Sequence, residues 1–305
     1  PMDDRHIDIV WDMETKDPDD FLTLLLLLGH PRVRLKAVTI TPGTPEQIGL
    51  VRWALDQFGR DVPVGAGHPK TSNTCVSQWH VDAYGSVPSS TDAVHAGPLL
   101  LSLCDRGTTL LTGAPPKNLG AAMNAGDFTV GRWVAQGGFA GEGVVPRDRQ
   151  LAKFAGRETC PTYNLNHAVK PVVRALEHPG IGVRRFVSKN VCHGIVYDAA
   201  LHAELAPLQS RSRSMELIWH GMAVFLEQGP ERVDGAPFGK MFHDPFAACC
   251  AIEVSIATWA QVELFRSKGE WGSLPASWTN TWITTGYDHE RFLEVLTMIE
   301  GEGSP

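Results

Sequence analysis

The sequence predicts an α/β fold, namely a single domain over residues 1–305 in which helices flank a mainly parallel central sheet with a Rossmann-like core. Three observations lead to this prediction. Short apolar runs alternate with longer amphipathic stretches, which is typical of parallel strands joined by helices. Of the 305 residues, 43% are hydrophobic and 20% are charged, which suits one large core. The chain contains no internal repeat and no low-complexity linker, so one domain is the simplest arrangement.

The alternation of short and long apolar segments runs along the whole chain. The sequence predicts strands at residues 7–11, 35–40, 108–111, 133–135, 183–187, 260–265 and 281–284. It predicts helices at residues 20–28, 46–58, 117–123, 169–176, 199–205, 215–226, 245–256 and 289–299. Because most of the early strands are followed by a helix, we expect a parallel sheet that is covered on both faces.

Two stretches do not fit the alternation, and both are rich in Gly, Pro, Ser, Thr and Asn. They cover residues 65–95 and 137–163, which we expect to be long loops. Loops of this length in a compact domain commonly lie over a binding site at the carboxyl ends of the strands.

The charge, the cysteines and the apolar runs limit the kinds of partner and the cellular compartment that we expect. A formal net charge of -7 provides no basic face for a phosphate backbone, so we expect a small-molecule partner and not a nucleic acid. The six cysteines form no CxxC pair and no zinc-ligand spacing, which fits a reducing compartment. The longest apolar run, residues 21–28, is far shorter than the roughly 20 residues that span a bilayer. We therefore expect a cytoplasmic protein without a membrane partner.

An acidic loop follows the first predicted strand. It places Asp12, Glu14, Asp17, Asp19 and Asp20 within nine residues, between an apolar strand and an apolar helix. Crowded carboxylates repel one another unless a cation or water neutralises them. Oxygen ligands alone favour Ca²⁺ or Mg²⁺ over zinc.

A helix-capping role is the alternative explanation of this loop. Acidic residues are common in the first turn of a helix, which accounts for Asp19 and Asp20. It does not account for Asp12 and Glu14, because these follow directly on a core strand, at the end where α/β folds bind ligands.

Six segments of the chain resemble motifs of the inosine-uridine preferring nucleoside hydrolases. Residues 12–20 resemble the DxDxxxDD signature of that family. The other five follow in the family's order: TLLTGAPPKNLGAAM at 109–123, WVAQGGFAGEG at 133–143, PTYNLNHA at 161–168, NVCHG at 190–194 and FHDPFAACCAI at 242–252. The resemblance implies a nucleoside hydrolase-like fold and a Ca²⁺-dependent enzyme, with Mg²⁺ as the alternative cation. Its reaction would be hydrolysis of the N-glycosidic bond of a ribonucleoside or modified nucleoside.

The resemblance also implies a set of site residues. Glu14, Asp20, Asp244 and the backbone carbonyl of Thr112 would hold the metal, and Asp12 would orient this set. One ligand carboxylate, Glu14, would take the proton of the attacking water. Negative carboxylates beneath the sugar would stabilise an oxocarbenium-like transition state.

Further side chains would contact the substrate. Asp19 would accept hydrogen bonds from the ribose, Asn164 would contact it, and Asn166 and Thr44 are additional candidates. His243 is the first candidate for protonating the departing base, followed by His80 and His193. A lone histidine more often has a surface or core role. Candidates for stacking on a base are Trp79, Phe139, Trp219 and Trp282.

The segment around His243 also has a structural interpretation. Pro245 is typical of the first residue of a helix, which would make Asp244 its cap. Only the distant acidic loop favours metal ligation by Asp244.

The chain departs from the family pattern at several positions. Glu14 replaces the second aspartate of the signature, and the loop is one residue longer. Thr44, Thr162 and Asn190 stand where the family has Asn, Glu and Asp. An unusual N-riboside is therefore expected as substrate.

Two other classes of function remain open. One is a non-catalytic homologue that binds metal and ribose. The other is a phosphatase, for which Lys16 and Lys117 are the nearest basic residues. The resemblance implies a homodimer or a homotetramer.

Overall fold

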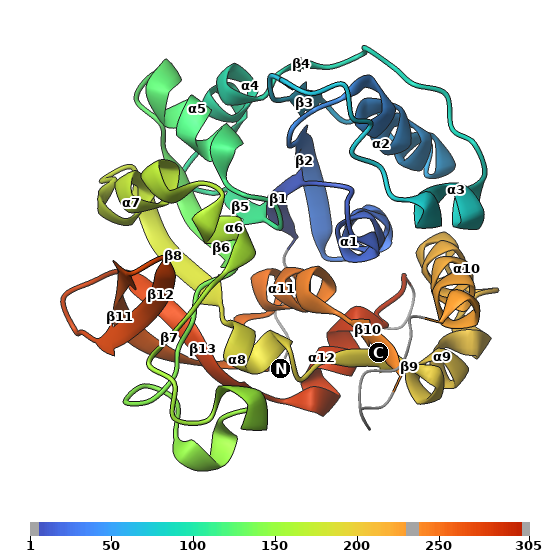
Figure 1. Cartoon of the computed structure of the whole chain (residues 1–305). Helices are drawn as coiled ribbons and strands as arrows, with labels where there is room; N and C mark the ends of the chain where they lie inside the picture. The colour runs from blue at the N-terminus through green and yellow to red at the C-terminus, as the bar shows by residue number, and fades with distance from the viewer. Residues whose placement is uncertain (1–5, 230–237, 301–305) are drawn as a thin grey trace.

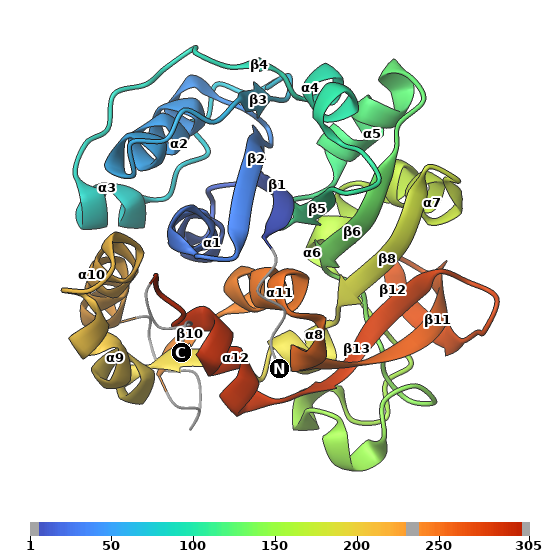
Figure 2. The same cartoon turned by 180° about the vertical axis from the view of Figure 1, so that it is seen from behind.

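The computed structural model describes residues 6–229 and 238–300. One mixed sheet of eleven strands forms its centre, in the order β4-β3-β2-β1-β5-β6-β8-β13-β11-β12-β7. Its strands are β1 (Ile7–Met13), β2 (Val33–Ile40), β3 (Val64–Ala66), β4 (Val94–His95), β5 (Thr109–Thr112), β6 (Val130–Gln136), β7 (Thr159–Cys160), β8 (Ile181–Val187), β11 (Ala257–Ser267), β12 (Glu270–Pro275) and β13 (Thr281–Tyr287). Figures 1 and 2 show the sheet running from β4 at the top of each view through β1 to β12.

The sheet is parallel from β4 to β13 and antiparallel beyond it. All pairings from β4 through β8 to β13 are parallel, whereas β11 pairs antiparallel with both β13 and β12. A separate antiparallel pair joins β9 (Val196–Asp198) to β10 (Gly239–Met241). The predicted α/β class with a mainly parallel sheet is confirmed.

Helices cover both faces of the sheet (Figures 1 and 2). They are α1 (Pro18–Gly29), α2 (Pro45–Gln57), α3 (Gln78–Tyr84), α4 (Ala96–Leu103), α5 (Lys117–Ala125), α6 (Tyr163–Asn166), α7 (Val169–Glu177), α8 (Lys189–Cys192), α9 (Ala199–Leu205), α10 (Arg213–Gln228), α11 (His243–Ile252) and α12 (His289–Leu296). Every strand and helix named in the sequence analysis is present.

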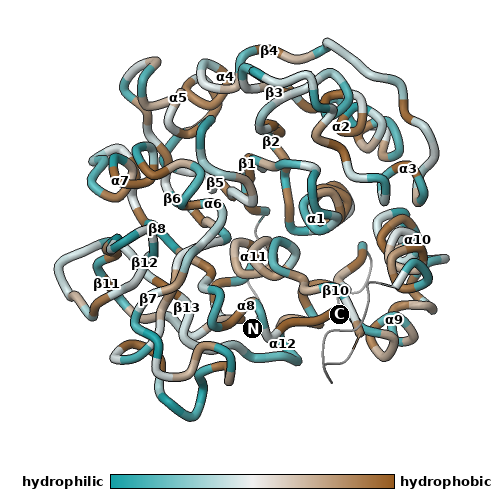
Figure 3. The backbone as a smooth tube through the Cα atoms, viewed as in Figure 1, coloured by the Kyte–Doolittle hydropathy of each residue, from teal (hydrophilic) through white to brown (hydrophobic). Residues whose placement is uncertain are grey.

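The side chains of β1 alternate between the two faces of the sheet and pack in the hydrophobic core on each face. Ile9 and Trp11 point to one face, where they pack in the cluster that contains the buried leucines of α1 and the apolar side chains of α11. Val10 points to the other face, toward the cluster formed by α4, α5 and α7. Successive strand residues face opposite sides, so a continuous apolar run is what a strand buried on both faces requires. The apolar side of α1 is visible as the brown helix beside β1 in Figure 3.

The two stretches predicted to be loops are only partly irregular. Residues 65–95 contain α3, and residues 137–163 contain β7 and two 3-10 turns at Arg147–Arg149 and Ala152–Phe154. Trp79 of α3 is buried and donates its indole N–H to the Gly221 carbonyl in α10 (2.9 Å). This helix is too short to show a helical period in the sequence, so its tertiary contacts determine it.

The start of α11 differs from the prediction. The helix begins at His243 with Phe242 at the N-cap position, and it ends at Ile252, after which a 3-10 turn follows. Asp244 therefore lies inside the first turn, and the interpretation of Asp244 as the helix cap is wrong. Asp17 occupies the N-cap position of α1, but its side chain makes no capping hydrogen bond.

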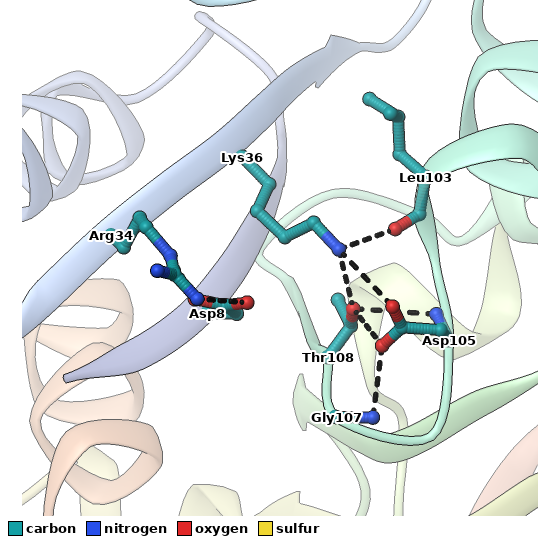
Figure 4. Close-up of polar contacts among 7 residues, drawn as sticks. All are labelled: Asp8, Arg34, Lys36, Leu103, Asp105, Gly107 and Thr108. Atoms are coloured by element: carbon teal, nitrogen blue, oxygen red, sulfur yellow. Dashed lines mark hydrogen bonds and ion pairs between the residues drawn. The ribbon is translucent and has the colours of Figure 1, made fainter. Parts of the chain in front are cut away.

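Polar side chains at the amino ends of the central strands pair with one another (Figure 4). Lys36 donates from Nζ to Thr108 Oγ1 (3.1 Å) and lies 3.6 Å from Asp105 Oδ2. The Thr108 hydroxyl donates in turn to Asp105 Oδ1 (2.9 Å). Arg34 donates from Nη2 to Asp8 Oδ2 (2.8 Å). The charged side chains drawn in Figure 4 therefore neutralise one another.

No helix in the described ranges is both long and apolar enough to cross a bilayer.

Candidate functional site

A cavity of about 480 Å³ lies at the carboxyl ends of the central strands. Its walls come from the loop after β1, the residues that follow β5 and β6, and the first turns of α6 and α11, together with α8. Segments far apart in the sequence meet there, near the middle of the molecule in Figure 1. This is where open α/β sheets bind their ligands.

The deepest feature of the cavity is a carboxylate cluster formed by Asp19, Asp20 and Asp244. One carboxylate oxygen of each residue lies within 4.8 Å of those of the other two. The first two residues belong to the first turn of α1 and the third to the first turn of α11. All three residues are at most 4% exposed. Three acidic groups thus share a space that water hardly reaches.

The hydrogen bonds to the carboxylate cluster come from backbone amides, which carry no full positive charge. The Asp244 amide donates to Asp19 Oδ2 (3.2 Å), and the Glu14 amide donates to Asp20 Oδ1 (3.0 Å). Asp244 Oδ1 is buried and has no hydrogen-bond partner. Burial and the neighbouring carboxylates raise the pKa values of Asp20 and Asp244 well above their usual range. A divalent cation would remove this repulsion.

Glu14 lies beside the carboxylate cluster and lines the same cavity. Its Oε2 accepts a hydrogen bond from the Lys16 amide (3.1 Å). Burial, with a smaller contribution from the charges of Asp17 and Asp19, raises the pKa of Glu14 to about 7. The glutamate is therefore another acid that a nearby cation would stabilise in its charged form.

Gly113 forms the wall against which the carboxylate cluster packs. A Cβ atom at this position would lie 2.6 Å from Asp244 Oδ1 and 3.0 Å from Asp20 Oδ1. Only glycine leaves room for these oxygens. The preceding residue, Thr112, is the last residue of β5, and its hydroxyl accepts a hydrogen bond from Trp133 Nε1 (3.0 Å). The Thr112 side chain is thus held in the core, and only its backbone remains for a ligand.

Asp12 lies at the carboxyl end of β1 and is completely buried. Its Oδ1 accepts hydrogen bonds from Thr39 Oγ1 (2.6 Å) and Asn118 Nδ2 (2.8 Å), while its Oδ2 has no partner. Burial raises the pKa of Asp12 to about 7, although both hydrogen bonds act in the opposite direction. The sequence analysis assigned no role to Thr39 or Asn118, although Asn118 lies in the segment 109–123 that carries the family resemblance.

Lys240 of β10 is the cation that the sequence analysis missed. Its Nζ lies 2.9 Å from Asp17 Oδ1 and 3.4 Å from Asp19 Oδ1. Burial alone would raise the pKa of Asp19, but Lys240 and His243 hold it below its usual value. Within the described ranges, Asp19 is therefore the only member of the carboxylate cluster that forms an ion pair. Nothing in the sequence around Lys240 marks it, since a single lysine has no pattern.

His193 and His243 both line the cavity and stack on each other, with ring centroids 4.5 Å apart and an interplanar angle of 19°. His243 Nε2 is buried without a partner. Burial lowers the pKa of His243 to about 4, and it lowers the pKa of His193 as well. Both imidazoles are therefore neutral at pH 7, and each can donate from one nitrogen only.

Cys192, His193 and His243 form a second group of potential metal ligands. The Cys192 Sγ lies within 4.8 Å of a ring nitrogen of each histidine. Burial raises the pKa of the Cys192 thiol to about 12, so it is not a thiolate at neutral pH. The ammonium groups of Lys153 and Lys189 act on both histidines and lower their pKa values, after burial as the main cause. The protonated thiol and the nearby ammonium groups disfavour the binding of a metal cation by these three residues.

Solved structures of known enzymes resemble this chain, although no family model and no curated protein sequence matches it. A plant nucleoside hydrolase matches 95% of this chain and 98% of its own with a TM-score of 0.73, at 18% identity. A purine-preferring ribonucleoside hydrolase from Gardnerella vaginalis matches 95% of this chain and 96% of its own with a TM-score of 0.67, at 14% identity. An inosine-uridine preferring nucleoside hydrolase from Bacillus anthracis matches 95% and 98% with a TM-score of 0.69, at 17% identity. The chain has the nucleoside hydrolase fold.

The nucleoside hydrolase fold brings most of the predicted site residues to one cavity. Glu14, Asp19, Asp20, Asn164, His193, His243 and Asp244 all line it. Asn164 is held by its Nδ2, which donates to the Gly113 carbonyl (2.9 Å) and to Gln136 Oε1 (2.9 Å). Gln136 lines the cavity as well, and the sequence analysis did not single it out.

Three predicted substrate contacts do not line this cavity. Thr44 caps α2, where its hydroxyl accepts from the Gln47 amide (3.2 Å) and donates to the Thr74 carbonyl (2.6 Å). His80 packs against aromatic side chains in the core. Asn166 bonds to the Gly269 carbonyl and accepts from Trp271 Nε1 (3.0 Å). These contacts satisfy Thr44 and Asn166 without a ligand, whereas His80 Nε2 is buried with no hydrogen-bond partner among the described residues.

The aromatic candidates are also absent from the cavity lining. Trp79 and Phe139 are buried, while Trp219 donates its indole N–H to the His202 carbonyl (2.9 Å). Tyr163, which the sequence analysis did not select, lines the cavity and is 52% exposed. An exposed ring at the cavity wall is the better surface for stacking on a heterocycle.

The residues of the site fit a hard divalent cation. The donor set consists of carboxylate oxygens, one of which, Asp244 Oδ1, is buried and unpartnered. The absence of a Cβ at Gly113 leaves space beside this oxygen. Such all-oxygen sets are typical of Ca²⁺ and Mg²⁺ sites.

Proposed function

We propose that this protein hydrolyses the N-glycosidic bond of a ribonucleoside or a modified N-riboside, with Ca²⁺ as its cofactor. The observation that carries the proposal is the buried, unpartnered Asp244 Oδ1 among Asp19 and Asp20, at the bottom of a cavity of about 480 Å³. The nucleoside hydrolase fold supports it independently.

Glu14, Asp20, Asp244 and the Thr112 carbonyl are the residues we assign to the cation. When bound, the cation supplies Lewis-acid activation of water and an anchor for sugar hydroxyls. Asp12, fixed by Thr39 and Asn118, lies behind this set and keeps the end of β1 in place.

The chain's own side chains perform the remaining steps. Glu14 accepts the proton of the attacking water, and Asp19 accepts hydrogen bonds from the ribose. The carboxylates beneath the sugar stabilise the positive charge that develops as the C–N bond breaks. His243, a neutral imidazole whose Nε2 has no partner among the described residues, donates a hydrogen bond to the departing base, and the proton that the base takes up comes from water. Asn164, held by Gly113 and Gln136, presents a fixed amide to the sugar.

The test uses protein stripped of metal by a chelator and then reloaded with Ca²⁺. We expect about one Ca²⁺ per chain by elemental analysis, and release of reducing sugar from at least one member of a broad ribonucleoside panel. Asp244→Asn should abolish the bound metal and lower kcat/KM on the order of 10²- to 10³-fold. Asp105→Asn, at the amino edge of the sheet, is the matched control and should change neither quantity.

The same experiment separates the other functions. Full Ca²⁺ occupancy with ribose binding by calorimetry, but without sugar release, would assign the chain to a binding protein. Release of phosphate from phosphate esters would assign it to a phosphatase. Light scattering tests the dimer or tetramer that the family resemblance implies.

A further inference from the structure

Two lysines at or beside the cavity wall have no acidic partner among the residues that the structure describes. Lys189 lines the cavity, and its Nζ donates to the Pro161 carbonyl (2.8 Å). The Nζ of Lys153 lies 2.7 Å from Nδ1 of His193, another residue of the cavity wall. We call these two residues the lysine pair. Within residues 6–229 and 238–300, no carboxylate forms an ion pair with either of them.

The lysine pair is held together despite its like charges. Both ammonium groups lie over the Phe154 ring, at 5.1 Å from its centroid for Lys153 and 5.7 Å for Lys189. Burial, and then the charge of Lys189, lowers the pKa of Lys153. The two like charges repel each other, and an anion bound by both ammonium groups would remove that repulsion.

The cavity wall beside the lysine pair offers an unused hydroxyl. Thr162 lines the cavity, is 1% exposed, and has a buried Oγ1 without a hydrogen-bond partner. Lys189 binds one end of the uncharged segment 161–163, and Lys16 binds the other end by donating to Tyr163 Oη (3.2 Å). The segment is thus flanked by ammonium groups and presents a donor that only a ligand can use.

We propose that the natural substrate carries a phosphomonoester, which the lysine pair and the Thr162 hydroxyl bind at the wall of the cavity. A phosphomonoester has a charge of about -1.5 to -2 at pH 7 and three acceptor oxygens, which suits two ammonium groups and one hydroxyl. This inference rests on the proposed function, which places the ring hydroxyls of the ribose at the carboxylate cluster. The 5′ position is then the part of the sugar left for the phosphate.

The reaction would be hydrolysis of a nucleoside 5′-monophosphate at its N-glycosidic bond. The hydroxyl of one water adds to C1′, and a proton goes to the departing base nitrogen. The products are the free base and ribose 5-phosphate, with the phosphomonoester intact. No oxidant or further reactant is needed.

Two measurements on the Ca²⁺-loaded protein test the inference and the proposed function separately. The first is calorimetric binding of ribose 5-phosphate compared with ribose, which tests the phosphate site without turnover. The second is kcat/KM for nucleosides compared with their 5′-monophosphates. We expect tighter binding of ribose 5-phosphate by about tenfold or more, and a similar preference for the monophosphates in kcat/KM.

Variants assign the preference to the proposed residues. Lys189→Met and Lys153→Met should each lower the affinity for ribose 5-phosphate about tenfold while leaving ribose binding within about twofold. Thr162→Val should act in the same direction. Lys170→Met, which removes an exposed lysine of α7, is the matched control and should leave the preference intact. The preference should also decrease as salt is raised.

Equal binding of ribose and ribose 5-phosphate would overturn the inference, whatever the protein hydrolyses. A preference for the phosphate that survives in both lysine variants would overturn the site. Tight binding of ribose 5-phosphate without any cleavage of nucleosides or monophosphates would leave the phosphate site in place and overturn the proposed function.

Discussion

The amino and carboxyl edges of the central sheet differ in how their charged side chains are paired. At the amino edge, Lys36 pairs with Asp105, and Arg34 pairs with Asp8 (Figure 4). At the carboxyl edge, Asp12 Oδ2 and Asp244 Oδ1 are buried and have no hydrogen-bond partner among the described residues. The four side chains named at the amino edge satisfy one another, so they need no ligand. Groups at the second edge remain incomplete, which is the state expected of a site that binds a cation.

The difference follows from burial as much as from charge. The Asp105 side chain is 66% exposed, and water screens it even without Lys36. The residues of the carboxylate cluster are at most 4% exposed, so each negative charge costs free energy unless something positive approaches it. Changes at the two edges should therefore have very different effects.

The largest effect is expected from Gly113→Ala. The added Cβ would lie 2.4 Å from the Trp11 ring, 2.6 Å from Asp244 Oδ1 and 3.0 Å from Asp20 Oδ1, so the ring and the carboxylates must move. Displacement of a site by about 1 Å costs roughly a hundredfold in rate, and we expect at least that loss in kcat/KM together with lost Ca²⁺ affinity. Gly107→Ala, in the loop of Figure 4, is the control, because its Cβ would meet only Asp105 Oδ1 at 3.3 Å. Normal Ca²⁺ binding by Gly113→Ala would show that the site can accommodate a Cβ at position 113.

A smaller effect, on stability, is expected from Lys240→Met. Without the ammonium group, Asp19 remains buried beside Asp17 with no cation. Removal of one partner of a buried ion pair costs about 3 kcal/mol, and we expect this loss in the urea-derived free energy of unfolding without Ca²⁺. Saturating Ca²⁺ should reduce the loss, since the cation takes over the neutralisation. An equal loss with and without Ca²⁺ would mean that Lys240 and the cation site are independent.

The smallest effect is expected from Arg34→Met at the amino edge. The Arg34 side chain is 68% exposed, and exposed ion pairs contribute at most about 1 kcal/mol. We expect a change in the free energy of unfolding within that limit and unchanged Ca²⁺ affinity. A loss comparable to that of Lys240→Met would contradict the contrast between the two edges.

The sequence predicted the fold well because the fold depends on periodic patterns. The runs around Ile9 and Leu25 are apolar enough to be recognised as a doubly buried strand and a buried helix. Some of the shortest elements, such as β4 and α6, show no period and were not predicted. They depend on contacts with segments distant in the sequence.

The same distinction separates the site residues that the sequence revealed from those that it did not. The acids of residues 12–20 were visible because they are consecutive, and Asp244 was found only through the family resemblance. Lys240, Thr39 and Gln136 were missed, since each is a single polar residue that becomes meaningful only when the strands assemble. His80 was selected on its type alone, and the structure places it in an aromatic core.

The long sequence separation within the carboxylate cluster has a consequence for synthesis of the chain. Asp19 and Asp244 are 225 residues apart, and Lys240 is made almost as late as Asp244. At about 5 to 20 residues per second, translation of this interval takes roughly 10 to 45 seconds. During that time the first turn of α1 carries its acids without the ammonium group that neutralises Asp19. The contacts of Asp19 with Lys240 and Asp244 can therefore form only after β10 and the start of α11 have left the ribosome, so a late part of the chain completes the surroundings of the first helix.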